Sequence, residues 1–442
     1  MDINATLLTH LATGAGAASI LRAVRPNVVA LAQSFFEART DISRLQTAQN
    51  VAEEILLKND LRDLIEIRDI VAKQELHRQI RYGKQQDHTA HTVYLYFLGL
   101  WLYDNLPQIA SAVQITCGSK EYAERDNYFL LQWTYASLLH DIGYAFHNLE
   151  PETTKDRQLM DSVFSWTWIK KQYPSMSKDA EEVLRRAHQS WSSKYSGLMP
   201  SGTAAYAQNS QEDVLRRLAA APWLGEIFPE FQGQDLFDVL DETCSLRKYA
   251  FEVARDGYGG KGPCVDHAVA SGLFLLQYTS FWYWIIQQIE ITASVNVYEE
   301  ITGGFNYDRQ NIVSDFIPAC RAVAFHNIQP QNKTSESIIP KLTLSEAPIT
   351  FLAILCDELQ RWDRSPAGWM HLDQYRLFSK SALESRNIEI LCNGPREDPR
   401  VLFLIGKNRR RQKFAEQFRK TLEKRLPDYS KILLIGTRIG ST

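Results

Sequence analysis

The chain has 442 residues, of which 45% are hydrophobic and 11% aromatic, so it can bury a large core and is not an intrinsically disordered protein. Its formal net charge of −3 excludes a protein that coats nucleic acid without sequence preference, because such binding needs a strongly cationic surface. Six cysteines without a CxxC pair, and a start without a signal-like apolar segment, predict reduced thiols in a cytoplasmic protein.

The first 80 residues form an N-terminal series of predicted helices. Apolar spacing predicts helices over residues 5–23, 27–38, 42–58 and 61–77, with Pro26 and Asn59–Asp60 as breaks. This region is either a helical cap on a catalytic core or a surface for homo-oligomerisation, and the sequence does not distinguish the two.

Two further apolar segments, residues 93–103 and 128–140, are predicted helices, and the second ends in His140 and Asp141. An imidazole beside a carboxylate at the end of a buried helix is costly to desolvate, and a divalent cation compensates that cost. Taken alone the dipeptide is weak evidence, since a buried histidine is usually satisfied by a carbonyl group or a water molecule.

The same combination recurs along the chain: a histidine or aspartate at an end of an apolar helical segment, or within one. The residues concerned are His91, His188, Asp266–His267, His326 and Asp357. Such recurrence is not expected of surface residues and predicts a shared buried site. His88, three residues before His91, competes with it for one position, and His326 could instead cap its helix through a carbonyl.

Residues 268–286 are apolar and aromatic and come close to the length that a membrane span needs. They include Gln277, Thr279 and Ser280 and have no flanking basic cluster, which favours a buried core helix that carries His267 in its first turn. We therefore expect no membrane contact.

A glycine-rich segment, residues 256–263, precedes this helix and contains Lys261. Lys261 or the nearby backbone amides could contact a phosphate group, although a plain connection between helices is the alternative. Long loops beside a site are where substrate selection is often located.

The C-terminal region, residues 384–442, has a different pattern. Short strands are predicted at 387–391, 401–405 and 431–436, with a basic helix at 408–425, which together make a small α+β appendage. Six basic residues of this helix could contact nucleic acid or a phosphorylated ligand, unless they form a solvated helix face: Arg409, Arg410, Arg411, Lys413, Arg419 and Lys420.

Over about residues 80 to 365 the chain resembles the HD superfamily of metal-dependent phosphohydrolases. The resemblance is carried by the ordered signature His91, His140–Asp141 and Asp357, with His188, His267 and His326 where two-metal members have additional ligands. It implies a mainly α protein in which an HD-domain helical bundle, residues 81–383, lies between the N-terminal cap, residues 1–80, and the C-terminal appendage.

The resemblance also implies the ligand set. His91, His140, Asp141 and Asp357 would form a first metal site, and Asp141 would bridge to a second site built from His188, His267 and His326. Imidazole and carboxylate ligands suit two divalent ions of manganese, iron, cobalt, nickel, zinc or magnesium more than calcium. His140 and Asp141 would then have catalytic roles.

One departure from the family is that Tyr144–Ala145–Phe146 follows the His-Asp pair where many HD enzymes carry a lysine. Another cation would have to contact the substrate phosphate. The candidates are Lys261, which we expect to serve the reaction, and Lys84, Arg321 and Arg361.

The implied function is a phosphodiesterase or nucleotidase that hydrolyses a phosphoester of a nucleotide, cyclic nucleotide or short oligonucleotide through a metal-activated hydroxide. Two alternatives stay open. The chain could be a nucleotide-sensing HD module that regulates a partner without turnover, or an HD-fold di-iron oxygenase.

Overall fold

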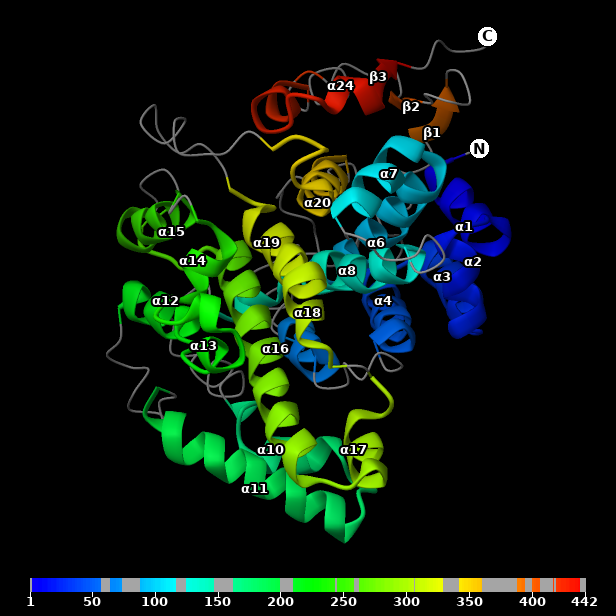
Figure 1. The fold of residues 1–442 in the computed structure, drawn as a ribbon. Helices are drawn as coiled ribbons and strands as arrows, with labels where there is room; N and C mark the ends of the chain where they lie inside the picture. Colours follow the sequence, from blue (N-terminus) through cyan, green and yellow to red (C-terminus); the bar gives the residue numbers. More distant parts are fainter. Residues whose placement is uncertain are drawn as a thin grey trace. The chain divides into compact units, whose positions relative to one another are not determined.

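The computed structural model describes residues 2–56, 64–73, 88–116, 125–146, 162–198, 210–242, 245–257, 262–305, 307–328, 342–359, 388–393, 400–405, 416 and 419–437. The described chain is mainly α-helical with one three-stranded sheet, as the sequence predicts (Figure 1). It divides into two compact units, residues 1–55, 71–139 and 340–442 in the first and residues 56–70 and 140–339 in the second.

The described part of the first unit contains the N-terminal helices together with helices from later in the chain. Its helices are α1 (Ile3–Thr13), α2 (Ala17–Val24), α3 (Val28–Glu37), α4 (Asp41–Leu56), α6 (His88–Asn105), α7 (Pro107–Thr116), α8 (Arg125–Leu138) and α20 (Pro348–Leu359). The helices predicted over 93–103 and 128–140 are confirmed as α6 and α8.

The single helix predicted over residues 5–23 is wrong, because the chain breaks between α1 and α2. Gly16 has a φ of 67°, which favours glycine. Asp104 of α6 accepts hydrogen bonds from the backbone N–H groups of Ala17 and Ala18, at 2.8 and 2.9 Å. A distant carboxylate therefore caps a new helix where local periodicity indicated continuity.

The helices α6 and α8 pack closely in the core of the first unit. The indole Nε1 of Trp133 donates to the backbone carbonyl of Tyr96 at 2.9 Å. A Cβ atom at Gly99 would lie only 1.9 Å from Cζ2 of Trp133. Because no side chain fits there, the glycine sets how closely the helix that carries His91 approaches its neighbour.

The sheet also belongs to the first unit. Strands β1 (Ile388–Asn393) and β2 (Arg400–Ile405) pair antiparallel, with Ile388 opposite Ile405, and β3 (Leu433–Thr437) pairs parallel to β2, with Val401 opposite Leu433. The short helix α24 (Tyr429–Ile432) leads directly into β3. The three predicted strands are confirmed to within two residues at each end.

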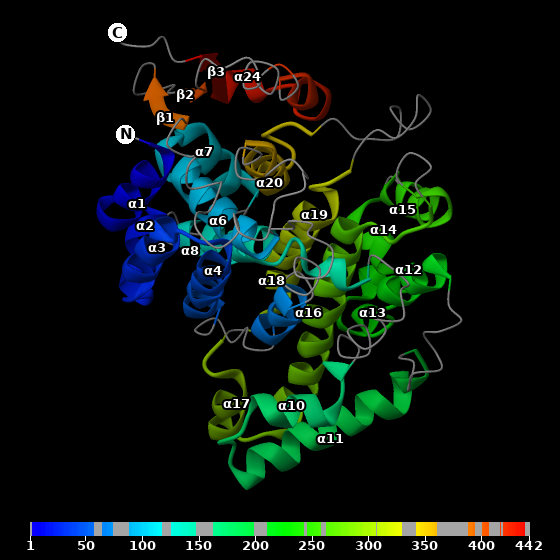
Figure 2. The ribbon, with the colours of Figure 1, turned by 180° about the vertical axis from the view of Figure 1, so that it is seen from behind.

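The second unit is built around one long helix, α16 (His267–Thr292). Its other elements are η2 (Ile142–Phe146), α10 (Trp166–Gln172), α11 (Lys178–Tyr195), η3 (Ser196–Leu198), α12 (Gln211–Ala219), α13 (Leu224–Ile227), η5 (Pro229–Phe231), α14 (Leu236–Leu240), α15 (Ser245–Asp256), α17 (Val295–Thr302), α18 (Arg309–Asn311), η7 (Ile312–Phe316) and α19 (Ile317–Phe325). Figures 1 and 2 show α12 to α15 gathered along α16, and α10 and α11 toward its C-terminal end.

Every residue of α16 from His267 to Ile286 is buried. The helices α11, α12, α13 and α19 and the 3₁₀ helix η2 all pack against it. Aromatic side chains fill part of this core, and Trp191 meets Phe281 edge to face at 4.7 Å between ring centroids. The prediction of a buried core helix that begins with His267 is confirmed.

Within the described ranges, no single helix is long and apolar enough to cross a membrane, and only the bent pair α1 and α2 passes that test, by length and composition alone.

The two compact units cross the boundaries that the sequence suggested near residues 80 and 383. Residues 71–139, α20 and the C-terminal sheet all belong with the N-terminal helices. Packing between segments that are far apart in the sequence decides this grouping, and no change of composition along the chain marks it.

Candidate metal centre

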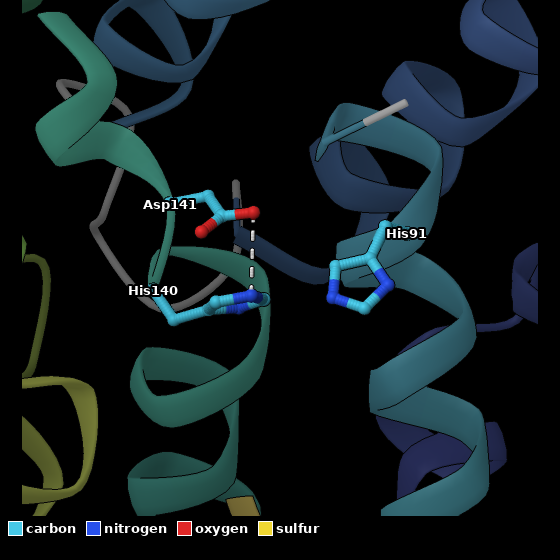
Figure 3. Close-up of side chains that lie close together, drawn as sticks. All are labelled: His91, His140 and Asp141. Atoms are coloured by element: carbon cyan, nitrogen blue, oxygen red, sulfur yellow. Dashed lines mark ion pairs between the residues drawn. The ribbon is translucent and has the colours of Figure 1, made fainter. Parts of the chain in front are cut away.

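His140 and Asp141 lie in the turn after α8, which ends at Leu138. The chain turns there into η2, and the backbone N–H of Tyr144 donates to the carbonyl of Asp141 at 3.1 Å. Both side chains are almost fully buried, and Nε2 of His140 lies 3.4 Å from Oδ2 of Asp141, the contact drawn as a dashed line in Figure 3.

His267 is the first residue of α16, and Asp266 caps that helix. The Asp266 carboxylate accepts from the backbone N–H of Val269 at 3.0 Å and from the hydroxyl of Tyr249 at 2.9 Å. Asp266 is fully buried and held by these two donors. Its side chain thus fixes where the helix begins, and with it the place of the His267 imidazole.

His326 follows the last residue of α19 and is buried. Its Nδ1 lies 2.7 Å from the backbone carbonyl of Val323. A carbonyl oxygen can only accept, so Nδ1 carries a proton and donates it. In the neutral imidazole the lone pair is then on Nε2, which is the atom that faces Asp141.

These residues meet at the Asp141 carboxylate. Its Oδ1 lies 3.3 Å from Nε2 of His267 and 3.7 Å from Nε2 of His326, and ligand atoms of the three residues lie within 4.8 Å of one another. The rings of His140 and His326 are perpendicular, 4.6 Å between centroids. We call His140, Asp141, His267 and His326 the Asp141 cluster.

The Asp141 cluster has the chemistry of a cation site. In the neutral form of His326, the Nε2 lone pair faces Oδ1 of Asp141, so two electron-rich atoms lie 3.7 Å apart in a buried setting. A positive charge between them, a proton or a metal ion, removes this repulsion. Because neutral imidazoles and an ionised carboxylate are common ligands of divalent transition metals, the Asp141 cluster could hold a metal ion.

The first unit contains a buried imidazole–carboxylate pair. Nε2 of His91, in the first turns of α6, lies 2.8 Å from Oδ1 of Asp357, in the last turn of α20, and both residues are buried. Figure 3 draws the His91 imidazole projecting from α6. The competing His88 begins α6, but its side chain lies outside the described residues.

His188 is not brought into the Asp141 cluster, contrary to the ligand set that the resemblance implies. Its Nε2 lies 2.9 Å from the backbone carbonyl of Phe164, and its ring is flanked by Trp166 and Trp191. Burial lowers the pKa of His188 despite the opposing hydrogen bond to Phe164. A neutral imidazole that donates to a carbonyl in an aromatic core is a packed core residue.

Of the side chains predicted to contact a phosphate group, most lie outside the described residues, and Arg321 makes a structural contact. Lys261, Lys84 and Arg361 lie outside the described residues, as do Arg409, Arg410, Arg411 and Lys413 of the basic helix. The Nε of Arg321, on α19, donates to the backbone carbonyl of Leu240 at 2.7 Å. That contact gives Arg321 a structural role in joining α19 to α14.

Sequence reasoning missed three residues that surround His267. The Tyr144 ring stacks on the His267 ring, 4.0 Å between centroids with planes 13° apart. The backbone N–H of Gly143 donates to Oγ of Ser271 at 2.7 Å, and this hydroxyl donates to the carbonyl of His267 at 2.8 Å. The one signal in the sequence was the spacing of four residues between His267 and Ser271, which places them on one helix face.

Comparisons with protein-family models, with curated proteins and with solved structures find no match to this chain.

Proposed function

We propose that this protein is a metal-dependent phosphohydrolase, a phosphodiesterase or nucleotidase that acts on a nucleotide, a cyclic nucleotide or a short oligonucleotide. The observation that carries the proposal is the Asp141 cluster, in which imidazoles from three different elements face one buried carboxylate. Its support from the sequence is the ordered signature shared with the HD superfamily.

The proposed ligands are the four residues of the Asp141 cluster together with His91 and Asp357. The last two are included because they complete the ordered signature and because α6 and α20 already hold them as a buried imidazole–carboxylate pair. His188 is left out of the proposal, since its Nε2 is engaged by the carbonyl of Phe164.

Asp141 is suited to bridge two cations. Its Oδ1 faces His267 and His326, whereas its Oδ2 faces His140, so each carboxylate oxygen has its own imidazole partners. This division supports a pair of divalent ions of manganese, iron, cobalt, nickel, zinc or magnesium. Such ions would polarise a phosphoryl oxygen and lower the pKa of a water molecule, the two requirements of phosphoester hydrolysis at neutral pH.

The residues of the chain have distinct tasks in this proposal. Asp141 supplies the negative charge that holds the cations, and His140, His267 and His326 orient them from separate elements. The hydrogen bond from Nδ1 of His326 to Val323 fixes the tautomer that presents a lone pair. The donors are buried, so bulk water does not compete with the cations for them.

The test is metal content and hydrolysis measured on the same preparations. Purified protein would be stripped with a chelator, reloaded with each divalent metal, and assayed with bis(p-nitrophenyl) phosphate and a panel of nucleotides. We expect the Asp141→Asn variant to lose bound metal and at least roughly a hundredfold in activity. His188→Gln, a change at a buried histidine outside the Asp141 cluster, is the control that should keep both.

Wild-type activity that survives complete metal removal would exclude the proposal, and so would an Asp141→Asn variant with normal metal content and turnover. A nucleotide bound tightly without turnover under every metal would instead favour the regulatory module.

A further inference from the structure

The hydroxyl of Ser271 joins the two elements that carry Asp141 and His267. It accepts from the backbone N–H of Gly143, two residues after Asp141, at 2.7 Å. It donates to the backbone carbonyl of His267 at 2.8 Å. Because Ser271 is fully buried, no water competes for either hydrogen bond.

The backbone of η2 approaches α16 very closely at this joint. A Cβ atom at Gly143 would lie 2.0 Å from the carbonyl oxygen of His267 and 2.6 Å from the backbone nitrogen of Ser271. Only glycine allows this approach, which the hydrogen bonds of Ser271 then hold. The separation between the Asp141 turn and the first turn of α16 is thereby set by backbone contacts.

The ring of Tyr144 adds a second restraint, on the imidazole itself. It lies almost parallel to the His267 ring, at 4.0 Å between centroids. Stacking limits rotation of the imidazole about its side-chain bonds, so Nε2 stays directed at Oδ1 of Asp141, 3.3 Å away. Tyr144 is half-buried, whereas His267 is buried.

We propose that Ser271 and Tyr144 are positioning residues, which together hold the His267 imidazole against the Asp141 carboxylate in the geometry that a divalent cation requires. Ser271 sets the distance between the two backbones, and Tyr144 sets the orientation of the ring. The proposal rests on the proposed metal centre and identifies what orients one of its ligands, since partners behind metal-binding histidines commonly control affinity.

The experiment uses Co²⁺ as the probe, because its visible absorption bands report the number and geometry of its ligands. Metal-free full-length protein would be titrated with Co²⁺ and followed by absorption and calorimetry. We expect Tyr144→Leu and Ser271→Ala to bind Co²⁺ roughly tenfold to a hundredfold more weakly than wild type, with altered bands. Tyr144→Phe keeps the stacked ring and should restore wild-type binding.

Ser280→Ala is the matched control for Ser271→Ala. Ser280 lies on the same helix, accepts from the indole Nε1 of Trp223 at 2.9 Å and donates to the carbonyl of Gln277 at 2.9 Å. It is therefore the same kind of buried hydroxyl joint, about 14 Å further along the helix axis. Its loss should lower the melting temperature while leaving the Co²⁺ affinity and bands unchanged. Tyr298→Leu, at another half-buried tyrosine of the second unit, is the control for Tyr144→Leu.

Wild-type affinity and bands in both Tyr144→Leu and Ser271→Ala would overturn the positioning role. Equal weakening by Ser280→Ala would also overturn it, because the effect would then come from helix stability. Circular dichroism identifies a variant that has not folded. Because Ser271 is buried and Tyr144 is half-buried, the two substitutions differ in how strongly they are expected to disturb folding. A wild type that binds no Co²⁺ would overturn both proposals. A wild type that binds it normally but hydrolyses no phosphoester would remove the proposed function alone.

Discussion

At the scale of single residues, hydrogen-bond partners decide which histidines can act as ligands. His326 and His188 are both buried, and each has one ring nitrogen against a backbone carbonyl. In His326 this nitrogen is Nδ1, so Nε2 is directed to Asp141. In His188 it is Nε2 itself that meets the carbonyl of Phe164. The same residue type thus takes a candidate ligand position in one case and a packing position in the other.

Glu226 provides a residue-scale prediction about pH. It accepts hydrogen bonds from Lys194, from the hydroxyl of Tyr195, and from the indole of Trp284 at 2.9 Å. Burial alone would raise the pKa of Glu226, but these donors outweigh it and hold the pKa below its usual value of 4.5. The stabilisation is therefore complete above about pH 4.5 and is lost as the pH falls through the lowered pKa.

We expect Glu226→Gln to lower the free energy of unfolding by about 1 kcal/mol at pH 7, a modest value because Lys194 and Glu226 are partly exposed. The difference from wild type should shrink at the lowest pH at which urea unfolding can still be followed. Glu230→Gln, at an exposed glutamate of the same unit, is the control. A difference that does not change with pH would contradict the assigned cause.

At the scale of elements, the candidate ligands of the second unit lie where helices begin or end. His267 opens α16, His326 follows α19, and His140 and Asp141 follow α8. Such positions let side chains from separate helices converge while each helix keeps its apolar surface in the core. A helix contributes to the site mainly through the point at which it starts or stops, which capping residues such as Asp266 determine.

Close packing of α6 against α8 leads to a prediction at this scale. Gly99→Ala would place a Cβ atom 1.9 Å from Cζ2 of Trp133, so the two helices must move apart. We expect this change to lower the free energy of unfolding by about 1 to 3 kcal/mol, measured by urea denaturation. In Gly197→Ala the new Cβ atom meets nothing within 4 Å, so this variant should have wild-type stability. Equal stability of the two variants would contradict the packing described for α6.

At the scale of the whole molecule, sequence-distant segments form each compact unit, and a buried ion pair ties the C-terminal region to the first. The NH1 of Arg425 lies 3.4 Å from Oε1 of Glu358, with both side chains almost fully buried. The carbonyl of Arg425 also accepts from the backbone N–H of Leu342 at 3.3 Å. Glu358 is the neighbour of Asp357 in α20, so the segment around Arg425 supports the element that carries this proposed ligand.

We expect Arg425→Met to destabilise the protein by about 3 kcal/mol, because it leaves the charge of Glu358 buried without this partner. Glu358→Gln combined with Arg425→Met should be closer to wild type, because the charge is removed with its partner. Thermal unfolding of the single and double variants measures the coupling between the two residues. Additive effects would show that the ion pair does not link the C-terminal region to α20.

The amino-acid sequence is sufficient to predict the helical class, the buried helix that begins at His267, the C-terminal strands and the polar residues at helix ends. These features depend on local periodicity and on residue types that start or stop a helix. The break at Gly16 could not be predicted, because the carboxylate that caps α2 comes from Asp104, far along the chain.

Which of those polar residues meet depends on how the helices pack against one another. The tertiary structure places His267 and His326 at Asp141 and gives His188 a carbonyl partner instead, and it reveals Tyr144 and Ser271 behind His267. The physical reason is that a side chain's partners are set by packing between segments remote in sequence. The spacing of residues along one helix carries no information about the atoms on the next.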